Sequence, residues 1–322
     1  MGNILTMKFI DAKTLEESTN FVDLIEALKT GFQSNITCPM RHHHDYENPA
    51  VGINSTLLLM PAWQSGENLG VKVVTVSPQN GQYGLPAIQG IYLLFDGLTG
   101  QPKLFLEGKT LTTKRTAAAS ALASSFLSNK NSRTLLMVGT GALAPNLIEA
   151  HCTQRPIEQV WIWGRNPDKA QALALEINNK GIQCSAVDSL EAYIPQADII
   201  SCATLSPTPL ILGKWLRPGQ HIDLVGSYKK DTREADDNVI QKASIFVDTF
   251  QGGLKESGDI LIPLQSQILK REEVLADLFT LCQRKHPGRT SREQITVFKS
   301  VGHALEDLVA ANYFHQKIEK RV

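Results

Sequence analysis

The stretch Arg133-Thr-Leu-Leu-Met-Val-Gly139-Thr-Gly141-Ala-Leu-Ala144-Pro-Asn-Leu-Ile-Glu-Ala-His151 decides the fold of this chain. Its apolar residues 135–138 predict a buried strand that runs directly into a glycine turn, and a helical pattern follows at once. Gly139 permits the tight turn, Gly141 lets the backbone approach a phosphate, and Ala144 keeps helix and strand close. The N–H groups of the first helical turn and the helix dipole attract an anion. The stretch therefore predicts a binding site for the pyrophosphate of a dinucleotide.

Apolar strand patterns alternate with helical segments from Arg133 onward, which predicts a parallel, doubly wound sheet. The predicted strands are residues 135–138, 160–163, 197–203, 222–225 and 245–247. Ligands of such sheets lie beyond the carboxyl ends of the strands. Thr204 follows the third predicted strand, and Val225, Gly226 and Ser227 stand at the end of the fourth, so these are candidate ligand-binding residues.

The end of the second predicted strand bears on the choice between NAD and NADP. An Asp or Glu about twenty residues after the glycines would bind the ribose 2′-hydroxyl of NAD, but Gly164-Arg165-Asn166 stands there. The planar cation of Arg165 suits a 2′-phosphate; an ordinary surface arginine is the alternative. We therefore predict NADP(H) as the cofactor, with NAD(H) bound at lower affinity. The cofactor-binding residues predicted so far are Gly139, Thr140, Gly141, Ala142, Ala144, Arg165, Asn166, Thr204, Val225 and Gly226.

The bulk composition is that of an ordinary globular protein, and 322 residues are enough for about two domains. Lys plus Arg and Asp plus Glu balance at 32 each, so no net charge attracts nucleic acid or an anionic membrane. The five cysteines form no Cys-x-x-Cys pair, which predicts neither a disulfide framework nor a zinc site. The sequence lacks the pattern of a signal peptide and any apolar run near eighteen residues, so we predict a cytoplasmic protein.

The residues before the glycine turn predict a second domain of mixed structure. A short strand at residues 8–10 precedes an amphipathic helix at 18–30, with Ser18 as its N-cap and Gly31 as its stop. Strand patterns separated by turn signals follow at residues 56–60, 70–76, 88–95 and 102–106. This pattern favours an antiparallel or mixed sheet.

Three adjacent histidines, His42, His43 and His44, have the composition of a metal site. Consecutive residues of an extended chain point to alternating faces, however, and ligating histidines need partners from another element. We therefore predict a solvated or hydrogen-bonded loop and no bound metal, and the role of the three histidines stays open.

Two helices carry charged residues of interest. An alanine-rich helix is predicted over residues 110–123, with Arg115 in its first turns, where the helix dipole disfavours a positive charge. This indicates an anionic partner; a structural pair with Glu107 is the alternative. His303 and Asp307 lie one turn apart on a strongly amphipathic C-terminal helix, and we favour surface or interdomain contacts for them over a catalytic dyad.

Seven motifs in this order resemble the ornithine cyclodeaminase/mu-crystallin family, nicotinamide-dependent proteins that act on small amino acids and cyclic imines. The motifs are Pro39-Met-Arg41, Gly70-Val-Lys72, Lys114-Arg115-Thr116-Ala-Ala-Ala-Ser120, Gly139-Thr-Gly141, Trp163-Gly-Arg-Asn-Pro167, His221-Ile-Asp-Leu-Val-Gly226 and Lys299-Ser-Val-Gly302. The resemblance implies an α/β fold in which a Rossmann doubly wound parallel sheet is inserted into an α+β substrate-binding domain that also forms a homodimer. We expect residues 1–120 with helix 299–322 in that domain, and residues 121–298 in the NADP-binding domain.

The resemblance also implies the roles of particular residues. Arg41, Lys72 and Arg115 correspond to the residues that hold the substrate carboxylate, and Lys72 also manages a proton at the reacting nitrogen. A surface arginine is the alternative for Arg41. Lys299 and Val301, in the last motif, complete the predicted cofactor-binding residues.

One departure from the cyclodeaminases bears on the reaction. Those enzymes carry an aspartate just after the Val-Gly of the fourth strand, where it handles the substrate amine. Here Ser227 and Tyr228 stand at that place, and Asp231 is the nearest following carboxylate. The local pattern is similar to the branch that reduces cyclic ketimines, Δ1-pyrroline-2-carboxylate to proline and Δ1-piperideine-2-carboxylate to pipecolate.

The resemblance therefore implies an NADPH-dependent ketimine reductase whose small-molecule partner is a cyclic imino acid. Ser227 would bond the substrate edge or the nicotinamide amide, with a plain turn residue as the alternative. Two other functions stay open: an ornithine cyclodeaminase or amino-acid dehydrogenase of the same family, and a non-catalytic, crystallin-like NADP-binding protein.

Overall fold

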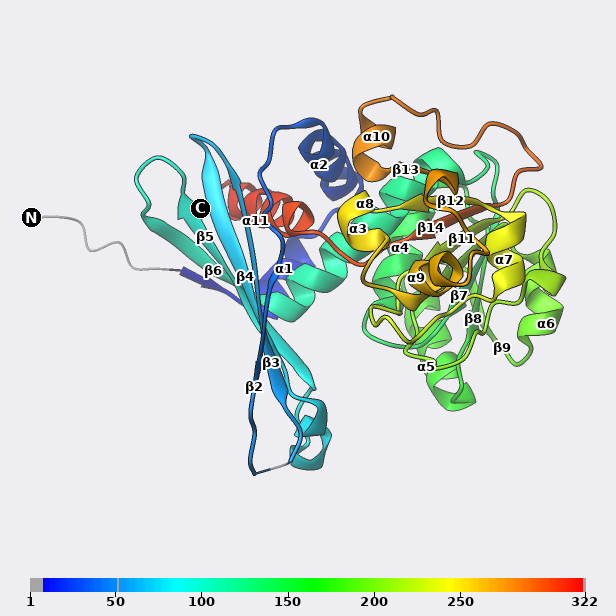
Figure 1. The fold of residues 1–322 in the computed structure, drawn as a ribbon, viewed down its shortest axis with the longest axis horizontal. Helices are drawn as coiled ribbons and strands as arrows, with labels where there is room; N and C mark the ends of the chain where they lie inside the picture. Colours follow the sequence, from blue (N-terminus) through cyan, green and yellow to red (C-terminus); the bar gives the residue numbers. More distant parts are fainter. Residues whose placement is uncertain (1–7, 51, 321–322) are drawn as a thin grey trace, which may run out of the picture. The chain divides into compact units, whose positions relative to one another are not determined.

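Two β-sheets form the centres of two units of this chain (Figure 1). The computed structural model describes residues 8–50 and 52–320. The units divide after Arg115 and after Gly302, so the second unit is inserted between two segments of the first. The sequence prediction of a doubly wound parallel sheet inserted into a second, α+β domain is confirmed.

The first unit contains a six-stranded sheet in the order β1-β6-β5-β4-β3-β2, antiparallel except for the pair β1–β6. Its strands are β1 (Lys8–Ile10), β2 (His42–Tyr46), β3 (Ser55–Gln64), β4 (Asn68–Val76), β5 (Ile88–Asp96) and β6 (Pro102–Glu107). Its helices are α1 (Ala12–Ser18), α2 (Phe21–Gln33), the 3-10 helix η1 (Pro78–Tyr83), the start of α3 (Gly108–Leu127) and α11 (Ala304–Glu319).

Helix α11 lies against one face of this sheet, where it contacts β3, β4 and β5, and it also contacts α2. Strand neighbours in register share a face. Met60, Lys72 and Tyr92 are such neighbours, and all three are buried. Lys72 thus lies in an otherwise apolar row of side chains that faces α11. Sequence patterning alone assigns this row to the apolar core.

The second unit contains an eight-stranded parallel sheet in the order β13-β12-β14-β11-β10-β7-β8-β9. Its strands are β7 (Thr134–Val138), β8 (Gln159–Trp163), β9 (Cys184–Val187), β10 (Ile199–Cys202), β11 (His221–Leu224), β12 (Ser244–Val247), β13 (Val274–Asp277) and β14 (Thr296–Lys299). Besides the rest of α3, its helices are α4 (Ala144–Gln154), α5 (Pro167–Asn178), α6 (Leu190–Tyr193), η2 (Ile194–Gln196), η3 (Gly213–Trp215), α7 (Asp237–Lys242), α8 (Phe250–Gly253), α9 (Gly258–Gln265), η4 (Arg271–Glu273) and α10 (Leu278–Cys282). The chain runs outward from β7 through β8 to β9, then returns to β10 on the other side of β7. The strand order therefore reverses between β7 and β10.

The two faces of this parallel sheet differ in character, because successive side chains of a strand point to opposite faces. One face is apolar and includes Val138, Cys202, Leu224, Val247 and Val297. On the other face, Ser201 Oγ donates to Asp223 Oδ2 (2.7 Å), and His151 Nε2 lies 3.2 Å from the same oxygen. His221 Nδ1 lies 2.9 Å from Thr296 Oγ1. These five polar residues are fully buried, so the sheet encloses a polar cluster that contains two histidines.

Three predictions for the first unit are corrected by the structure. The helix predicted from Ser18 begins instead after Asn20, whose side chain accepts a hydrogen bond from Asp23 N (3.2 Å). Gly31 does not end this helix; a Cβ there would lie 2.5 Å from Val309 Cγ2, so the glycine permits close packing against α11. The exposed histidines 42–44 lie in the edge strand β2, because β3 provides backbone partners for them, and not in a loop.

The C-terminal segment differs from the prediction in a similar way. The predicted helix at 299–314 begins only at Ala304, and Lys299 ends the strand β14. Most of α11 is buried, although its pattern predicts an exposed polar face, because both the sheet and α2 contact it. The strands β9, β13 and β14 were not predicted.

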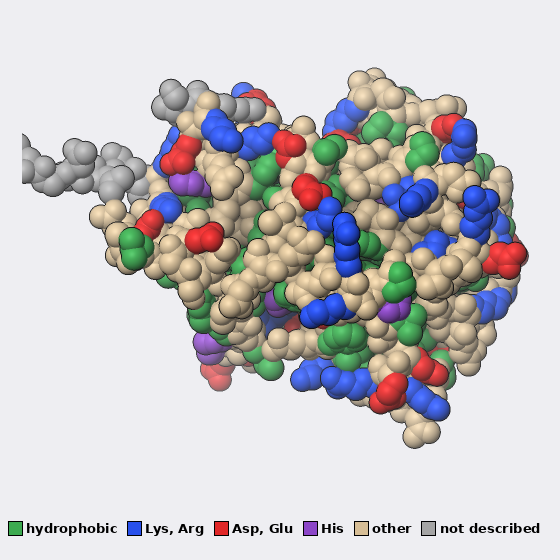
Figure 2. Space-filling model, turned by 90° about the horizontal axis from the view of Figure 1, so that it is seen from above, with side chains coloured by type: hydrophobic (Ala, Val, Ile, Leu, Met, Phe, Trp, Pro, Cys, Tyr) green, Lys and Arg blue, Asp and Glu red, His purple; other side chains and the backbone are tan. Residues whose placement is uncertain are grey.

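The surface carries both signs of charge, as the equal numbers of acidic and basic residues predict. Lys and Arg side chains are interspersed with Asp and Glu side chains on the face that Figure 2 shows. Within the described residues, no group of three or more His, Cys, Asp or Glu side chains is arranged to hold a metal ion. The helices described include none that combines the length and the apolar character needed to cross a membrane.

Candidate active site

The glycine turn after β7 has the backbone that a phosphate-binding turn requires. Gly139 has a φ of 117°, and a Cβ on it would lie 2.7 Å from the carbonyl oxygen of Ala203, so only glycine fits. Gly141 and Ala142 are exposed, and a Cβ on Gly141 would meet no heavy atom within 4 Å. Ala144 begins α4 and is fully buried, as close packing of helix on strand requires. The space over this turn is therefore open to a ligand.

The end of β8 lies directly beside this turn. A Cβ on Gly164 would lie 2.7 Å from Thr140 Cγ2. Arg165 is exposed immediately after the strand. Asn166 caps α5, because its Oδ1 accepts a hydrogen bond from Lys169 N (3.2 Å). The sequence prediction did not foresee that the Asn166 side chain already holds a helix end.

These features fit a dinucleotide. Doubly wound sheets bind such ligands at the point where the strand order reverses, with one mononucleotide half on each side of that point. Here the reversal lies between β7 and β10, and the glycine turn follows β7. A dinucleotide bound at this reversal would have its adenosine half toward β8 and Arg165, and its nicotinamide half toward the ends of β10 and β11.

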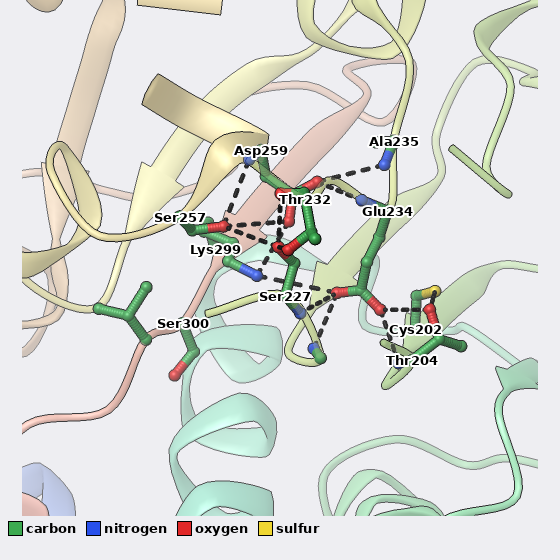
Figure 3. A network of polar contacts seen from close by, with 12 residues as sticks. Cys202, Thr204, Ser227, Thr232, Glu234, Ala235, Ser257, Asp259, Lys299 and Ser300 are labelled. Atoms are coloured by element: carbon green, nitrogen blue, oxygen red, sulfur yellow. Dashed lines mark hydrogen bonds and ion pairs between the residues drawn. The ribbon is translucent and has the colours of Figure 1, made fainter. Parts of the chain in front are cut away.

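One buried carboxylate joins the loops that follow β10 and β11 (Figure 3). Glu234 Oε1 accepts a hydrogen bond from Thr204 N (2.7 Å). Its other oxygen accepts from Gly226 N (2.7 Å) and Ser227 N (3.1 Å). A Cβ on Gly226 would collide with the backbone nitrogen and oxygen of Thr204, so the two loops lie in close contact.

Glu234 belongs to a buried group of three charged residues, which we call the Glu–Asp–Lys triad: Glu234, Asp259 and Lys299. Lys299 Nζ lies 3.0 Å from Asp259 Oδ2 and 3.7 Å from Glu234 Oε2, and all three residues are fully buried. Burial raises the pKa of Glu234. Burial also lowers the pKa of Lys299, but the two carboxylates more than offset this, so the net shift is upward. The side chain of Lys299, a predicted cofactor-binding residue, is thus engaged by acidic side chains inside the unit.

Ser227 and Val301 are also held by internal hydrogen bonds. The Ser227 hydroxyl is buried, donates to Thr232 O (2.6 Å) and lies 2.9 Å from Thr232 Oγ1. Val301 N donates to Asp248 Oδ2 (2.7 Å). The structure therefore favours the turn-residue alternative for the Ser227 side chain, and its contact with a substrate or with the nicotinamide amide stays a prediction.

The predicted substrate residues lie in the first unit, where Asp307 of α11 brings two of them together. Lys72 Nζ lies 2.7 Å from Asp307 Oδ2 and 2.9 Å from its Oδ1. Arg115 Nε donates to Asp307 Oδ1 (3.0 Å), and Arg115 Nη1 donates to Glu306 Oε2 (2.5 Å). All four side chains are buried. The prediction of surface or interdomain contacts for Asp307 is wrong, because this carboxylate lies in the core between two cations.

The proposed structural pair of Arg115 with Glu107 is not what the structure shows. Glu107 stands before α3, where its carboxylate accepts hydrogen bonds from Lys109 N (2.8 Å) and Thr110 N (2.7 Å). It therefore caps the helix that carries Arg115, and Arg115 instead contacts two carboxylates of α11.

The charges of this cluster act strongly on Lys72. Burial and the nearby Arg115 lower the pKa of Lys72 to about 8, with Asp307 opposing the fall and Arg41 adding to it. Burial raises the pKa of Asp307, but Arg115 and Lys72 outweigh it, so the net shift is downward. Arg41 is half-buried immediately before β2. Glu306 adds a second buried carboxylate beside Arg115.

Of the two carboxylates that organise these sites, sequence reasoning named Asp307 but assigned it to surface or interdomain contacts, and it missed Glu234. The one signal for Asp307 is its place on the helix together with an unexplained lysine in a core strand. For Glu234, the sequence gives no local signal, because the side chain that reaches the Gly226 amide comes from beyond Asp231, the nearest following carboxylate.

Comparison with known proteins places this architecture. The model of the ornithine cyclodeaminase/mu-crystallin family matches residues 6–321. The chain is 40% identical over 319 residues to Protein SAR DEFICIENT 4 of Arabidopsis thaliana, covering 96% of each chain. It is 37% identical over 317 residues to the Delta(1)-pyrroline-2-carboxylate reductase of Colwellia psychrerythraea, covering 98% of this chain and 99% of the relative.

A solved structure gives the same result for the fold. The Delta(1)-pyrroline-2-carboxylate reductase of Thermococcus litoralis, in complex with NADH and L-proline, superposes with a TM-score of 0.91 at 33% identity and 98% coverage of both chains. The match of the family model over nearly the whole length agrees with it. This chain belongs to the ornithine cyclodeaminase/mu-crystallin family.

Proposed function

We propose that this protein catalyses the NAD(P)H-dependent reduction of cyclic ketimines, Δ1-pyrroline-2-carboxylate to L-proline, Δ1-piperideine-2-carboxylate to L-pipecolate, or both. The observation that carries the proposal is the buried cluster in which Asp307 holds Lys72 and Arg115. It gathers a buried lysine and a buried arginine, and cations of this kind bind a substrate carboxylate through charge-assisted hydrogen bonds. The names of the bacterial and archaeal relatives support the same substrate class.

The reaction adds a hydride to the imine carbon and a proton to the imine nitrogen, so that C=N becomes CH–NH. A bound nicotinamide supplies the hydride. Lys72 donates the proton at the ring nitrogen; with a pKa of about 8 it is mostly protonated at neutral pH and still a competent acid. Arg41 and Arg115 hold the substrate carboxylate and so fix which face of the ring is presented.

The cofactor is assigned to the second unit. In this proposal the glycine turn, with Gly139, Thr140, Gly141, Ala142 and Ala144, holds the pyrophosphate on the first turn of α4. Arg165 favours NADP(H) over NAD(H) by binding the 2′-phosphate. The other half of the dinucleotide contacts the backbone near Thr204, Val225, Gly226 and the segment 299–301.

We further propose that the active form is a homodimer. The sheet face opposite α11 is apolar, with Leu59, Val73 and Ile91 in register, and these side chains are half-buried or exposed. An apolar sheet face of this kind is stabilised by a partner surface. A second copy of the first unit is the partner that the family resemblance implies.

The proposal is tested by mixing the purified protein with each cyclic imine and either NADPH or NADH. We expect oxidation of the nucleotide with formation of proline or pipecolate, and faster turnover with NADPH. Lys72→Met should reduce turnover by about 10²- to 10⁴-fold while nucleotide binding is kept. Lys109→Met, at an exposed position of α3, is the matched control and should leave the rate unchanged.

Two other outcomes would replace the proposal. Release of ammonia from ornithine without net change of the nucleotide would indicate a cyclodeaminase. Binding of the nucleotide with no turnover of either imine or of ornithine would indicate a crystallin-like binding protein.

A further inference from the structure

The Glu–Asp–Lys triad lies at the carboxyl ends of three neighbouring strands of the parallel sheet (Figure 3). Thr204 follows β10, Gly226 and Ser227 follow β11, and Lys299 is the last residue of β14. These ends lie on the side of the strand reversal away from β8. That side takes the second mononucleotide half of a bound dinucleotide.

Glu234 divides its two oxygens between two loops. In the loop after β10, Thr204 N donates a hydrogen bond to Oε1, which also lies 3.1 Å from Thr204 Oγ1. In the loop after β11, Gly226 N and Ser227 N donate hydrogen bonds to Oε2. Because one rigid carboxylate accepts from both loops, it fixes the distance between their backbones. Neither loop is part of a helix or strand at this point, so no regular secondary structure fixes this distance.

Glu234 is itself held from both ends. Its backbone N–H donates to Asp259 Oδ1 (2.6 Å), and Ala235 N donates to the same oxygen (3.2 Å). Lys299 lies between the two carboxylates and offsets part of their charge. A buried ionic group of this kind contributes little stability beyond well-packed apolar residues. The triad does, however, supply an acceptor for three backbone N–H groups, which apolar residues cannot do.

We propose that Glu234 is a positioning residue for the nicotinamide half of the cofactor, which fixes the loops at Thr204 and at Gly226–Ser227 in one arrangement. The inference rests on the proposed function, because it requires that a nicotinamide dinucleotide binds at the glycine turn. Glu234 makes no contact with the cofactor in this scheme. It acts through the backbone of residues that do.

The test compares two ligands on the same variant. Glu234→Gln keeps the shape of the side chain, but its amide group places N–H donors against backbone N–H donors, so at least one loop loses its acceptor. We expect the dissociation constant of NADPH, measured by calorimetry, to rise about ten-fold. The constant for adenosine 2′,5′-bisphosphate, which lacks the nicotinamide half, should stay within about two-fold, because the glycine turn and Arg165 are unchanged.

Two further variants sharpen the comparison. Asp231→Asn changes an exposed carboxylate of the same loop and should alter neither constant. Glu234→Asp keeps the charge but shortens the reach, and it replaces Glu234→Gln if that protein does not fold. The expected result is the same: NADPH binding weakens more than binding of the fragment.

Equal weakening of both ligands, or no weakening of either, would overturn the inference, since Glu234 would then have a general structural role or none. If the unsubstituted protein binds neither ligand nor their NAD-type counterparts, the proposed function is wrong and the inference falls with it. The two failures are thus distinguished by the unsubstituted protein alone.

Discussion

Asp307 raises the pKa of Lys72, whereas the neighbouring arginines lower it. Burial and Arg115 lower the pKa of Lys72 to about 8, and Asp307 limits the fall. Asp307→Asn removes this support, so the pKa of Lys72 should fall further. If protonated Lys72 is the acid, kcat/KM decreases as the pH rises through this pKa, above about 8 in the unsubstituted protein. The profile of Asp307→Asn should decrease at lower pH, as measured from kcat/KM for the cyclic imine.

A surface carboxylate provides the control for this prediction. Asp23 is exposed and pairs with Lys317, so Asp23→Asn should leave the pH profile unchanged. Superimposable profiles for Asp307→Asn and the unsubstituted protein would show that Lys72 is not the group that donates the proton.

At the scale of single residues, the sequence predicted the cations of the cluster better than the carboxylates that hold them. Lys72 and Arg115 stand in recognisable motifs, and the structure brings them together on one carboxylate. Asp307 follows Lys72 by 235 positions, and an acid on a helix has the same local pattern whether it faces water or the core. Glu234 was missed for a related reason. The chain folds back after Ser227, so that Glu234, seven positions later, accepts a hydrogen bond from its backbone N–H, and no local pattern shows this.

At the scale of elements, the N-terminus of α3 depends on one side chain. Glu107 accepts hydrogen bonds from two N–H groups of the first turn, at Lys109 and Thr110. Glu107→Ala leaves these donors without their cap and should lower the free energy of unfolding by about 0.5–2 kcal/mol, measured by urea denaturation. Glu26→Ala removes only an exposed contact to Lys29 and should change it by less than about 0.5 kcal/mol. Equal effects of the two changes would contradict the capping role.

The elements that were not predicted are short, and their partners are distant in sequence. The strands β9, β13 and β14 have four residues each, too few for periodicity to distinguish strand from helix. In β14, Thr296–Lys299 also precedes the pattern of α11, which made one long helix a reasonable prediction. The pairing with β11 and β12 decides the matter, and it depends on tertiary structure.

At the scale of the whole molecule, the buried His221 of the parallel sheet links stability to pH. Burial lowers the pKa of His221 well below 6.5, and His151, Arg289 and Arg155 act in the same direction. The folded state therefore keeps this imidazole neutral, while the unfolded chain takes up a proton near pH 6.5. The contribution of His221 to the free energy of unfolding is fully present above that pH and is lost as the pH falls below it, by up to about 1.4 kcal/mol per pH unit.

Urea-induced unfolding at several values between about pH 7 and pH 5 measures this dependence. His221→Gln removes the titrating group and should flatten the decrease, even if it lowers stability throughout. His44→Gln, on the exposed edge strand, should keep the original slope. An unchanged slope in His221→Gln would assign the acid sensitivity to other groups.

The long separation of Asp307 from Lys72 along the chain has a consequence for biosynthesis. Lys72 and Arg115 emerge from the ribosome long before Asp307, since 235 positions separate Lys72 from the Asp307 carboxylate. Two cations without a counter-charge cannot enter the core at an acceptable cost. The nascent polypeptide must therefore carry an unfinished first sheet throughout translation of the inserted unit, until α11 emerges and supplies the carboxylate.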